Sequence, residues 1–194
     1  MTSTTELGTR DRIVRAASLL MQQRGYEGTG IKQIAGEARA TLGSVYHFFP
    51  GGKEQLAVAA IEHGDQEFAE MLTASLAGEP DPAKAVDGCA RALAAHLKAS
   101  DWMNGCPISA TALETTGRVP AIERAVAQVF QHWQDLVADT LRTAGFDEDD
   151  ARELAMTVIN TLEGAELTAQ VFRSEAPLLV AGRHLALLID ASRP

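Results

Sequence analysis

Apolar residues along most of the chain recur at intervals of three and four, which is the spacing of one face of an α-helix. In the first such segment, residues 9–25, Ile13, Ala17 and Leu20 share a face, and Gly25 stands where the pattern stops. No segment alternates apolar and polar residues convincingly enough to indicate a strand. The pattern therefore predicts an all-α fold of about nine helices.

Two short helical segments follow the first one. They cover residues 31–40 and 42–49, with a tight turn around Arg39–Ala40 between them. Thr29 and Thr41 precede the two segments, where a hydroxyl oxygen can cap a helix N-terminus. Three helices with a short turn between the last two are typical of a helix-turn-helix unit.

Six further helical segments follow, separated by turns rich in Gly, Pro and Asp. They cover residues 52–78, 82–98, 108–116, 121–145, 149–174 and 177–192. Asp81 and Asp147 are suited to the N-termini of two of them. The last two helices are apolar on more than one face, which indicates burial in a core or against a partner. We expect a homodimer through these two helices, and a large monomer core is the alternative.

The length of 194 residues fits one large domain or two small ones that share a core. No segment reaches the roughly 20 uninterrupted apolar residues of a membrane span, and the polar residues 1–12 lack the apolar core of a secretory signal. Cys89 and Cys106 are too few for a disulfide framework. We therefore expect a cytoplasmic protein with no membrane partner.

Charge is distributed unevenly along the chain. The formal net charge of −9 argues at first against nucleic acid as a partner. Residues 1–56, however, hold seven Lys and Arg against five Asp and Glu, which leaves −11 for residues 57–194. An acidic body is repelled by DNA and presents the basic end outward. This distribution favours residues 1–56 as the segment that contacts DNA.

The first 60 residues carry an ordered motif. It comprises A-x-x-A at Ala35–Ala38, then Gly43 and Tyr46, then F-P followed by K-E-x-L at Lys53–Leu56. This order resembles the TetR family of bacterial transcriptional repressors. The extra glycine of FPGGKEQL and the GCPI sequence at 105–108 are most similar to the branch that includes the lincomycin-resistance repressors.

The resemblance implies that the third helix lies in the major groove of a double-stranded DNA operator. Gly43 would permit close approach, Tyr46 and His47 would reach phosphates, and Lys53 beside the free N–H groups of the next helix would form a phosphate seat. The predicted DNA-contacting residues are Thr29, Lys32, Arg39, Thr41, Leu42, Gly43, Ser44, Tyr46, His47 and Lys53. The alternative is that the aromatic residues of this segment only pack in a core.

Some residues depart from the family pattern. Arg39 occupies a turn position where the family usually has Gly, and a non-Gly residue with positive φ costs on the order of 1 kcal/mol. Arg39 is therefore expected either to strain the turn slightly or to reach a phosphate. We expect Phe48 and Phe49 to pack beneath the third helix.

The resemblance implies a helix-turn-helix DNA-binding domain over 1–56 and a ligand-binding and dimerisation domain over 57–194. The second domain would hold a cavity for a small effector. Bulky and polar side chains that suit an apolar or amphipathic molecule are Phe68, Met71, Trp102, Met103, Phe130, Trp133, Glu163 and Gln170. The alternative is that the rings simply fill the core.

Motifs of other functional classes are not found. The sequence has no GxSxG, GxxxxGK[ST] or HExxH motif, and its five His residues lack metal-ligand spacing, so we expect no enzyme, metal site or other cofactor. Cys106 is interpreted as a small buried hydrophobe rather than a thiol sensor. We expect a repressor that binds a pseudo-palindromic operator as a homodimer and is released by an effector. A DNA-binding regulator without an effector, or a small helical enzyme without recognisable motifs, are the alternatives.

Overall fold

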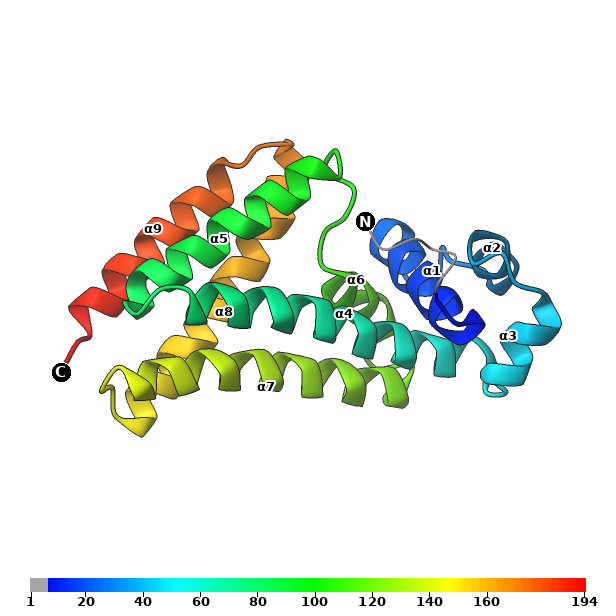
Figure 1. Cartoon of the computed structure of the whole chain (residues 1–194), viewed down its shortest axis with the longest axis horizontal. Coiled ribbons are helices and arrows are strands. Elements are labelled where there is room, and N and C mark those ends of the chain that lie inside the picture. Colours follow the sequence, from blue (N-terminus) through cyan, green and yellow to red (C-terminus); the bar gives the residue numbers. More distant parts are fainter. Residues whose placement is uncertain (1–6) are drawn as a thin grey trace. The chain divides into compact units, whose positions relative to one another are not determined.

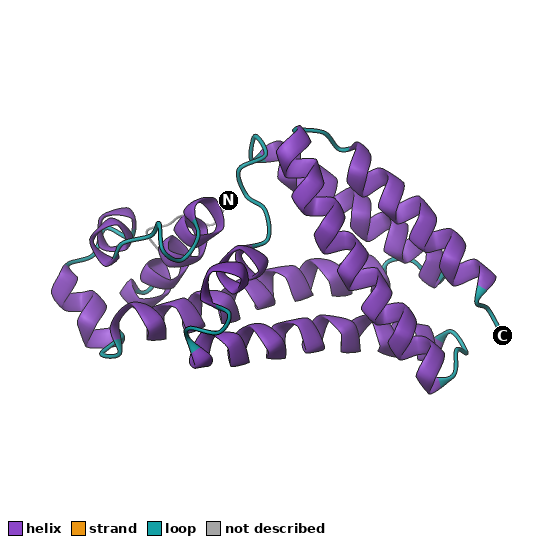
Figure 2. Cartoon of the chain, turned by 180° about the vertical axis from the view of Figure 1, so that it is seen from behind, coloured by secondary structure: helices purple, strands orange, loops and turns teal. Residues whose placement is uncertain are grey.

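The computed structural model describes residues 7–194, which contain nine α-helices and no strand (Figures 1 and 2). The helices are α1 (Thr9–Arg24), α2 (Ile31–Glu37), α3 (Leu42–Phe48), α4 (Gly52–Ala77), α5 (Pro82–Ala99), α6 (Pro107–Thr115), α7 (Pro120–Thr143), α8 (Glu148–Phe172) and α9 (Ala176–Ala191). The predicted all-α fold is confirmed. None of the helices in residues 7–194 is long and apolar enough to span a membrane.

The helix boundaries agree with the predicted ones within two residues, except at the end of α2. This helix ends three residues early, at Glu37, because Arg39 takes a left-handed conformation with φ 49°. The amide of Ala40 then donates to the Ala35 carbonyl over 2.9 Å and closes the turn. The turn between α2 and α3 is therefore built by the backbone.

The chain divides into two compact units. One comprises the described residues up to Gln66 together with Pro107–Ala127, and the other comprises Glu67–Cys106 together with Gln128–Pro194. Helices α4 and α7 each contribute to both units. The predicted functional boundary after residue 56 stays a prediction, because compactness does not say which residues hold DNA or an effector, and residues 1–6 lie outside the described part.

The core of the first unit forms where α1 packs against α2, α3 and α6. Large side chains buried in this unit include Ile13, Met21, Ile34, Phe49 and Leu56. The Arg12 guanidinium donates through Nε to the Ala38 carbonyl over 3.1 Å and so joins α1 to the turn that precedes α3. The position of α3 is thus set by its buried face and by α1.

The end of α1 is joined to α6 in the same unit. One carboxylate oxygen of Glu114, on α6, accepts a hydrogen bond from the Glu27 amide over 2.8 Å, and Arg118 pairs with the Glu27 carboxylate at 2.8 Å. A Cβ at Gly25 would lie 2.2 Å from Glu114, and Gly25 has φ 72°. The left-handed backbone conformation favours glycine here, and a side chain would also displace the Glu114 carboxylate.

In the second unit, α5, α8 and α9 pack against one another, and Figure 1 shows α5 and α9 side by side. The close approach of α9 to α5 depends on Gly182, where a Cβ would lie 2.7 Å from the Ala90 Cβ. Ion pairs connect the elements at both ends of these helices, with Lys98 to Glu175 at 2.7 Å and Arg193 to Asp81 at 2.6 Å. The N-terminus of α8 is capped by Asp147, which accepts from the Asp150 amide over 2.8 Å.

Candidate functional sites

Helix α3 begins with a side-chain cap. The Thr41 hydroxyl oxygen accepts a hydrogen bond from the Ser44 amide over 3.0 Å, as the sequence predicts, and lies 2.9 Å from the Ser44 hydroxyl. Val45 and Phe49 are buried beneath the helix. The cap and these two side chains orient α3 so that its other face is open to solvent.

The open face of α3 carries most of the residues predicted to contact DNA. Thr41, Leu42, Gly43, Tyr46 and His47 are exposed, and the Tyr46 side chain reaches 52% exposure. Lys32 on α2 and Arg39 in the turn are exposed as well. An exposed face with a hydroxyl, an imidazole and two cations beside it can donate hydrogen bonds to phosphate oxygens.

Gly43 is a position that the fold itself does not explain. Its φ is not positive, and a Cβ placed there would meet only the Thr41 Oγ1, at an ordinary 3.6 Å. Neither backbone conformation nor packing within the described chain therefore requires a glycine. Its absence of a side chain leaves room on the outer face of α3.

Lys53 lies at the start of α4. Its Nζ is 4.3 Å from the centroid of the Tyr26 ring, which is a cation–π contact. The turn before it is shaped by Gly52, with φ 68°, and by the Gly51 amide, which donates to the Gln55 side chain over 2.9 Å. The ring restricts the side chain of Lys53 and leaves the ammonium half-exposed beside a helix N-terminus.

Two expectations for this region are wrong. Thr29 does not cap α2, because Gly30 is the N-cap residue and the Thr29 hydroxyl donates instead to the Gly25 carbonyl over 2.8 Å. Thr29 is 0% exposed, so its side chain cannot reach DNA in this conformation. Phe48 is exposed rather than packed under α3, and its ring lies edge-on to His47 with centroids 5.1 Å apart.

The residues predicted to bind an effector fall into separate groups. Trp133 on α7 is buried, and its ring lies 4.2 Å from that of Phe68 on α4 and 5.5 Å from that of Phe130, between centroids. Met71 is half-buried one turn after Phe68. These rings come from helices that are distant in sequence and form one aromatic cluster.

A second group lies in the loop between α5 and α6. Trp102 has φ 67°, and its backbone amide donates a hydrogen bond to the Leu97 carbonyl at the end of α5. The next residue, Met103, is exposed. Gln170 on α8 donates to the Met103 carbonyl over 3.4 Å, and its side chain lies against Gly105, where a Cβ would be 2.6 Å away. The loop is therefore tied to α8.

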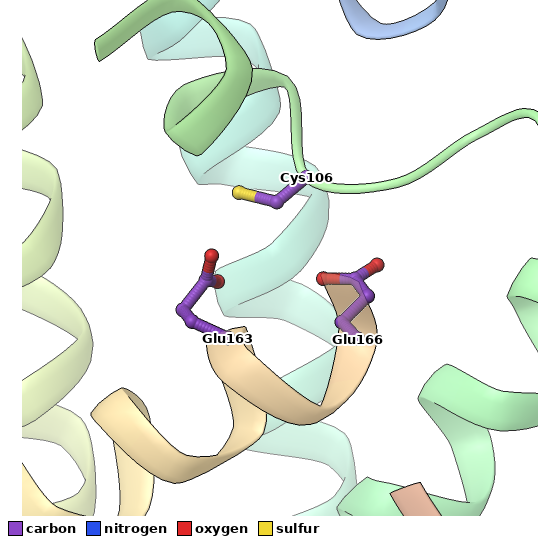
Figure 3. A group of neighbouring side chains, drawn as sticks. All are labelled: Cys106, Glu163 and Glu166. Carbon is purple, nitrogen blue, oxygen red and sulfur yellow. The ribbon is translucent and has the colours of Figure 1, made fainter. Parts of the chain in front are cut away.

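Glu163 belongs to a third group, with Cys106 and Glu166 (Figure 3). Glu166 is buried in α8, and this burial, together with the charge of Glu163, raises the pKa of its carboxyl to about 8. Burial, and the charge of Glu166, raise the pKa of the Cys89 thiol on α5 to about 12. Glu166 and Cys89 are thus buried in the second unit, whereas Cys106 and Glu163 are half-buried.

Sequence reasoning missed Glu166, although a signal is present. Buried positions on α8 include Ala155, Ile159, Leu162, Glu166 and Ala169, and Glu166 stands where the helical period predicts an apolar residue. An acidic residue on the apolar face of a helix is unusual, because burying a carboxylate is costly unless it is paired.

The outer faces of α8 and α9 expose large apolar side chains. On α8 these include Leu167, at 57%, and Phe172, at 70% exposure. The others on the two helices are Met156, Val171, Val180, Leu187 and Leu188. The sequence prediction that these helices are apolar on more than one face is reflected in these exposed side chains.

A tight turn between α2 and a capped, exposed α3 is typical of helix-turn-helix DNA-binding regulators. Residues 13–60 match the model of the bacterial regulatory proteins of the tetR family, and residues 82–184 match that of the C-terminal domain of LmrA/YxaF-like transcriptional regulators. The chain belongs to the TetR family of transcriptional regulators. The resemblance inferred from the motif at 35–56 is confirmed.

Relatives cover nearly the whole chain. An uncharacterized HTH-type transcriptional regulator of Mycobacterium tuberculosis is 35% identical over 193 residues, which cover 96% of this chain and 97% of the relative. The regulator LmrA of Bacillus subtilis is 32% identical over 171 residues, 88% and 90% of the two chains. The crystal structure of a regulatory protein TetR from Rhodobacter sphaeroides has a TM-score of 0.81 at 26% identity, and the match covers 91% of this chain and 96% of that one. The families and relatives are transcriptional regulators, so the chain is a regulator and not an enzyme.

Proposed function

We propose that the protein is a repressor that binds a pseudo-palindromic operator as a homodimer and releases it when a small molecule binds its C-terminal domain. The observation that carries the DNA-binding part is Gly43, a glycine on the exposed face of α3 that the fold does not need. In this proposal, residues 1–56 read the operator, and residues 57–194 dimerise and hold the effector.

The missing side chain at Gly43 supports a close approach of α3 to base edges. In the major groove, Leu42 offers an apolar contact that suits a thymine methyl group, and Thr41 and Ser44 offer hydroxyls. Tyr46, His47 and Lys53 would then reach the flanking phosphates, which set position rather than sequence preference. Lys32 and Arg39 add positive charge to the same exposed surface.

The variant Gly43→Ala tests this surface. The added methyl group meets no protein atom closer than 3.6 Å, and Ala has a higher helix propensity than Gly. The free energy of unfolding should therefore rise by up to about 1 kcal/mol. Operator affinity, measured by fluorescence anisotropy on DNA flanking the gene, should fall at least tenfold, which corresponds to about 1.4 kcal/mol. A gain in stability together with a loss of operator affinity would show that Gly43 serves DNA binding rather than folding.

The control is Gly88→Ala on α5, where an added Cβ likewise meets nothing within 4 Å. This variant should bind DNA as the parent does. Each measurement is made at two salt concentrations with scrambled DNA as competitor, because phosphate contacts alone give salt-dependent binding without selectivity. Unchanged selective binding by Gly43→Ala would contradict the proposed approach of α3.

The proposed dimer uses the exposed apolar faces of α8 and α9. A two-fold interface joins the same patch of two chains, and Leu167, Val171 and Phe172 on α8 with Val180 and Leu187 on α9 supply the apolar surface it needs. Such a dimer would place two recognition helices about 34–36 Å apart, one turn of B-DNA.

The proposed effector is a small apolar or amphipathic molecule that contacts the aromatic cluster of Phe68, Phe130 and Trp133. To release DNA, it must bind the DNA-incompetent conformation more tightly than the competent one. A panel of aromatic and amphipathic compounds is screened by tryptophan fluorescence and melting temperature, with Trp102→Phe isolating the Trp133 signal. If none changes either signal or DNA affinity, the protein is a DNA-binding regulator without an effector.

A further inference from the structure

Three ligand-type side chains meet in the second unit. The Cys106 Sγ and one carboxylate oxygen each from Glu163 and Glu166 all lie within 4.8 Å of one another. Glu163 and Glu166 are three residues apart on α8 and share a face, while Cys106 ends the loop that α8 holds through Gln170. Figure 3 shows both carboxylates rising from α8 toward the loop that carries Cys106.

Glu166 is the unusual member of this cluster. Its side chain is only 6% exposed, and a carboxylate oxygen of Glu163 lies within 4.8 Å of one of its own. An ionised carboxylate buried beside another acid is costly, because its hydration is lost and the like charge repels it. A cation bound between the two carboxylates would offset both costs.

We propose that Cys106, Glu163 and Glu166 bind a thiophilic divalent cation of the Zn²⁺ class. Thiolate sulfur and carboxylate oxygen are both Zn²⁺ ligands, whereas Mg²⁺ and Ca²⁺ prefer oxygen alone. Three protein ligands leave a fourth position open, as in exchangeable rather than closed structural zinc sites.

The geometry permits such a site after small side-chain rotations. Tetrahedral Zn²⁺ with bonds of about 2.0–2.3 Å places its ligand atoms about 3.3–3.7 Å apart. The ligand atoms of the cluster, within 4.8 Å of one another, need to close by at most about 1.5 Å, which χ rotations of the two glutamates can supply. A bound ion would tie the residue that precedes α6 to α8.

Cobalt(II) is the probe for this site, because a bound thiolate gives it a charge-transfer absorption band. The full-length chain is stripped with a chelator, kept reduced, and titrated with Co²⁺ in the absence of DNA. We expect one Co²⁺ per chain with the thiolate band, and displacement of the Co²⁺ by Zn²⁺. Mg²⁺ should not displace it. The result does not depend on operator binding, so the metal site and the proposed function fail or stand separately.

Variants assign the ligands. Cys106→Ser should abolish the thiolate band, and Glu166→Gln should weaken Zn²⁺ at least about tenfold. Glu153→Gln, an exposed acid on the same helix, is the matched control and should bind like the parent. Melting curves without metal establish that each variant folds.

Alkylation provides a second readout that does not use absorption. Zn²⁺ should slow the modification of Cys106 by iodoacetamide, followed by peptide mass spectrometry, while Cys89, at 0% exposure, stays unmodified in either condition and serves as internal control. The proposal is overturned if the folded parent binds no Co²⁺, if Cys106→Ser binds Zn²⁺ with unchanged affinity, or if Glu166→Gln and Glu153→Gln behave alike.

Discussion

Helices α3 and α8 both invert the usual distribution of polar and apolar residues, in different ways. The short α3 exposes Leu42, Tyr46 and a glycine that the fold does not require. The long α8 exposes Leu167 and other apolar side chains, yet it buries the carboxyl of Glu166. In each helix the residues that internal packing does not explain lie where a partner molecule would contact them.

The difference between the two helices concerns what kind of partner they suit. The face of α3 is small, partly polar and flanked by Lys32, Arg39 and Lys53, which favours a polyanion. The C-terminal part of α8 exposes Leu167, Val171 and Phe172, which favours a second protein surface. Its inner face presents acids beside a thiol, which favours a cation.

The largest expected effect comes from placing a charge on the apolar face of α8. Leu167→Glu should dissociate the dimer, raising its dissociation constant at least about 100-fold, because a carboxylate would be buried twice at a two-fold interface. Operator affinity should fall with it, since the two half-sites would no longer be bound together. Light scattering after gel filtration measures the mass.

The matched control for that variant is Leu113→Glu on α6. Leu113 is also a large apolar side chain and is 82% exposed, but it lies outside α8 and α9. It should leave the mass unchanged. If both variants remain dimers, another surface joins the two chains, and the exposed apolar side chains of α8 do not form the dimer interface.

A medium effect is expected at the phosphate seat. Lys53→Ala should weaken binding to every DNA sequence alike and lower the slope of log affinity against log salt by about 0.9 for each phosphate that Lys53 neutralises. Anisotropy at several salt concentrations gives the slope. Lys84→Ala, which removes an exposed cation from α5, is the control. An unaltered slope in Lys53→Ala would place Lys53 off the DNA, with its ammonium against the Tyr26 ring.

The smallest effect is expected in the turn before α3. Arg39 has φ 49°, so Arg39→Gly should raise the free energy of unfolding by up to about 1 kcal/mol, measured by urea denaturation. Arg173→Gly is a close match, because Arg173 has φ 50° at the end of α8. If Arg39→Gly lowers both the DNA affinity and the slope of log affinity against log salt, Arg39 contacts a phosphate. No gain in stability in either variant would show that the left-handed arginines are unstrained.

Much of the fold could be predicted from the sequence because helix signals act over short distances. The caps at Thr41, Asp81 and Asp147 each need only an amide two or three residues further on, and all three are confirmed. The left-handed turn at Arg39 follows from its place between two helices. The exposed face of α3 follows likewise from the apolar spacing of Val45 and Phe49.

Other features required the tertiary structure. Thr29 is a good cap by type, yet Gly30 takes that place and Thr29 is buried against the end of α1. Phe48 resembles a core residue by type and is exposed, because Phe49 fills the space under α3.

The nine helices of the described chain, the caps at Thr41, Asp81 and Asp147 and the helix-turn-helix motif could be inferred from the sequence alone, because each depends on neighbours within about four residues along the chain. The packing of α6 on α1 and the meeting of Cys106 with Glu163 and Glu166 could not be inferred in this way. Residues so far apart in sequence come together through the packing of whole helices, and no local spacing records that event.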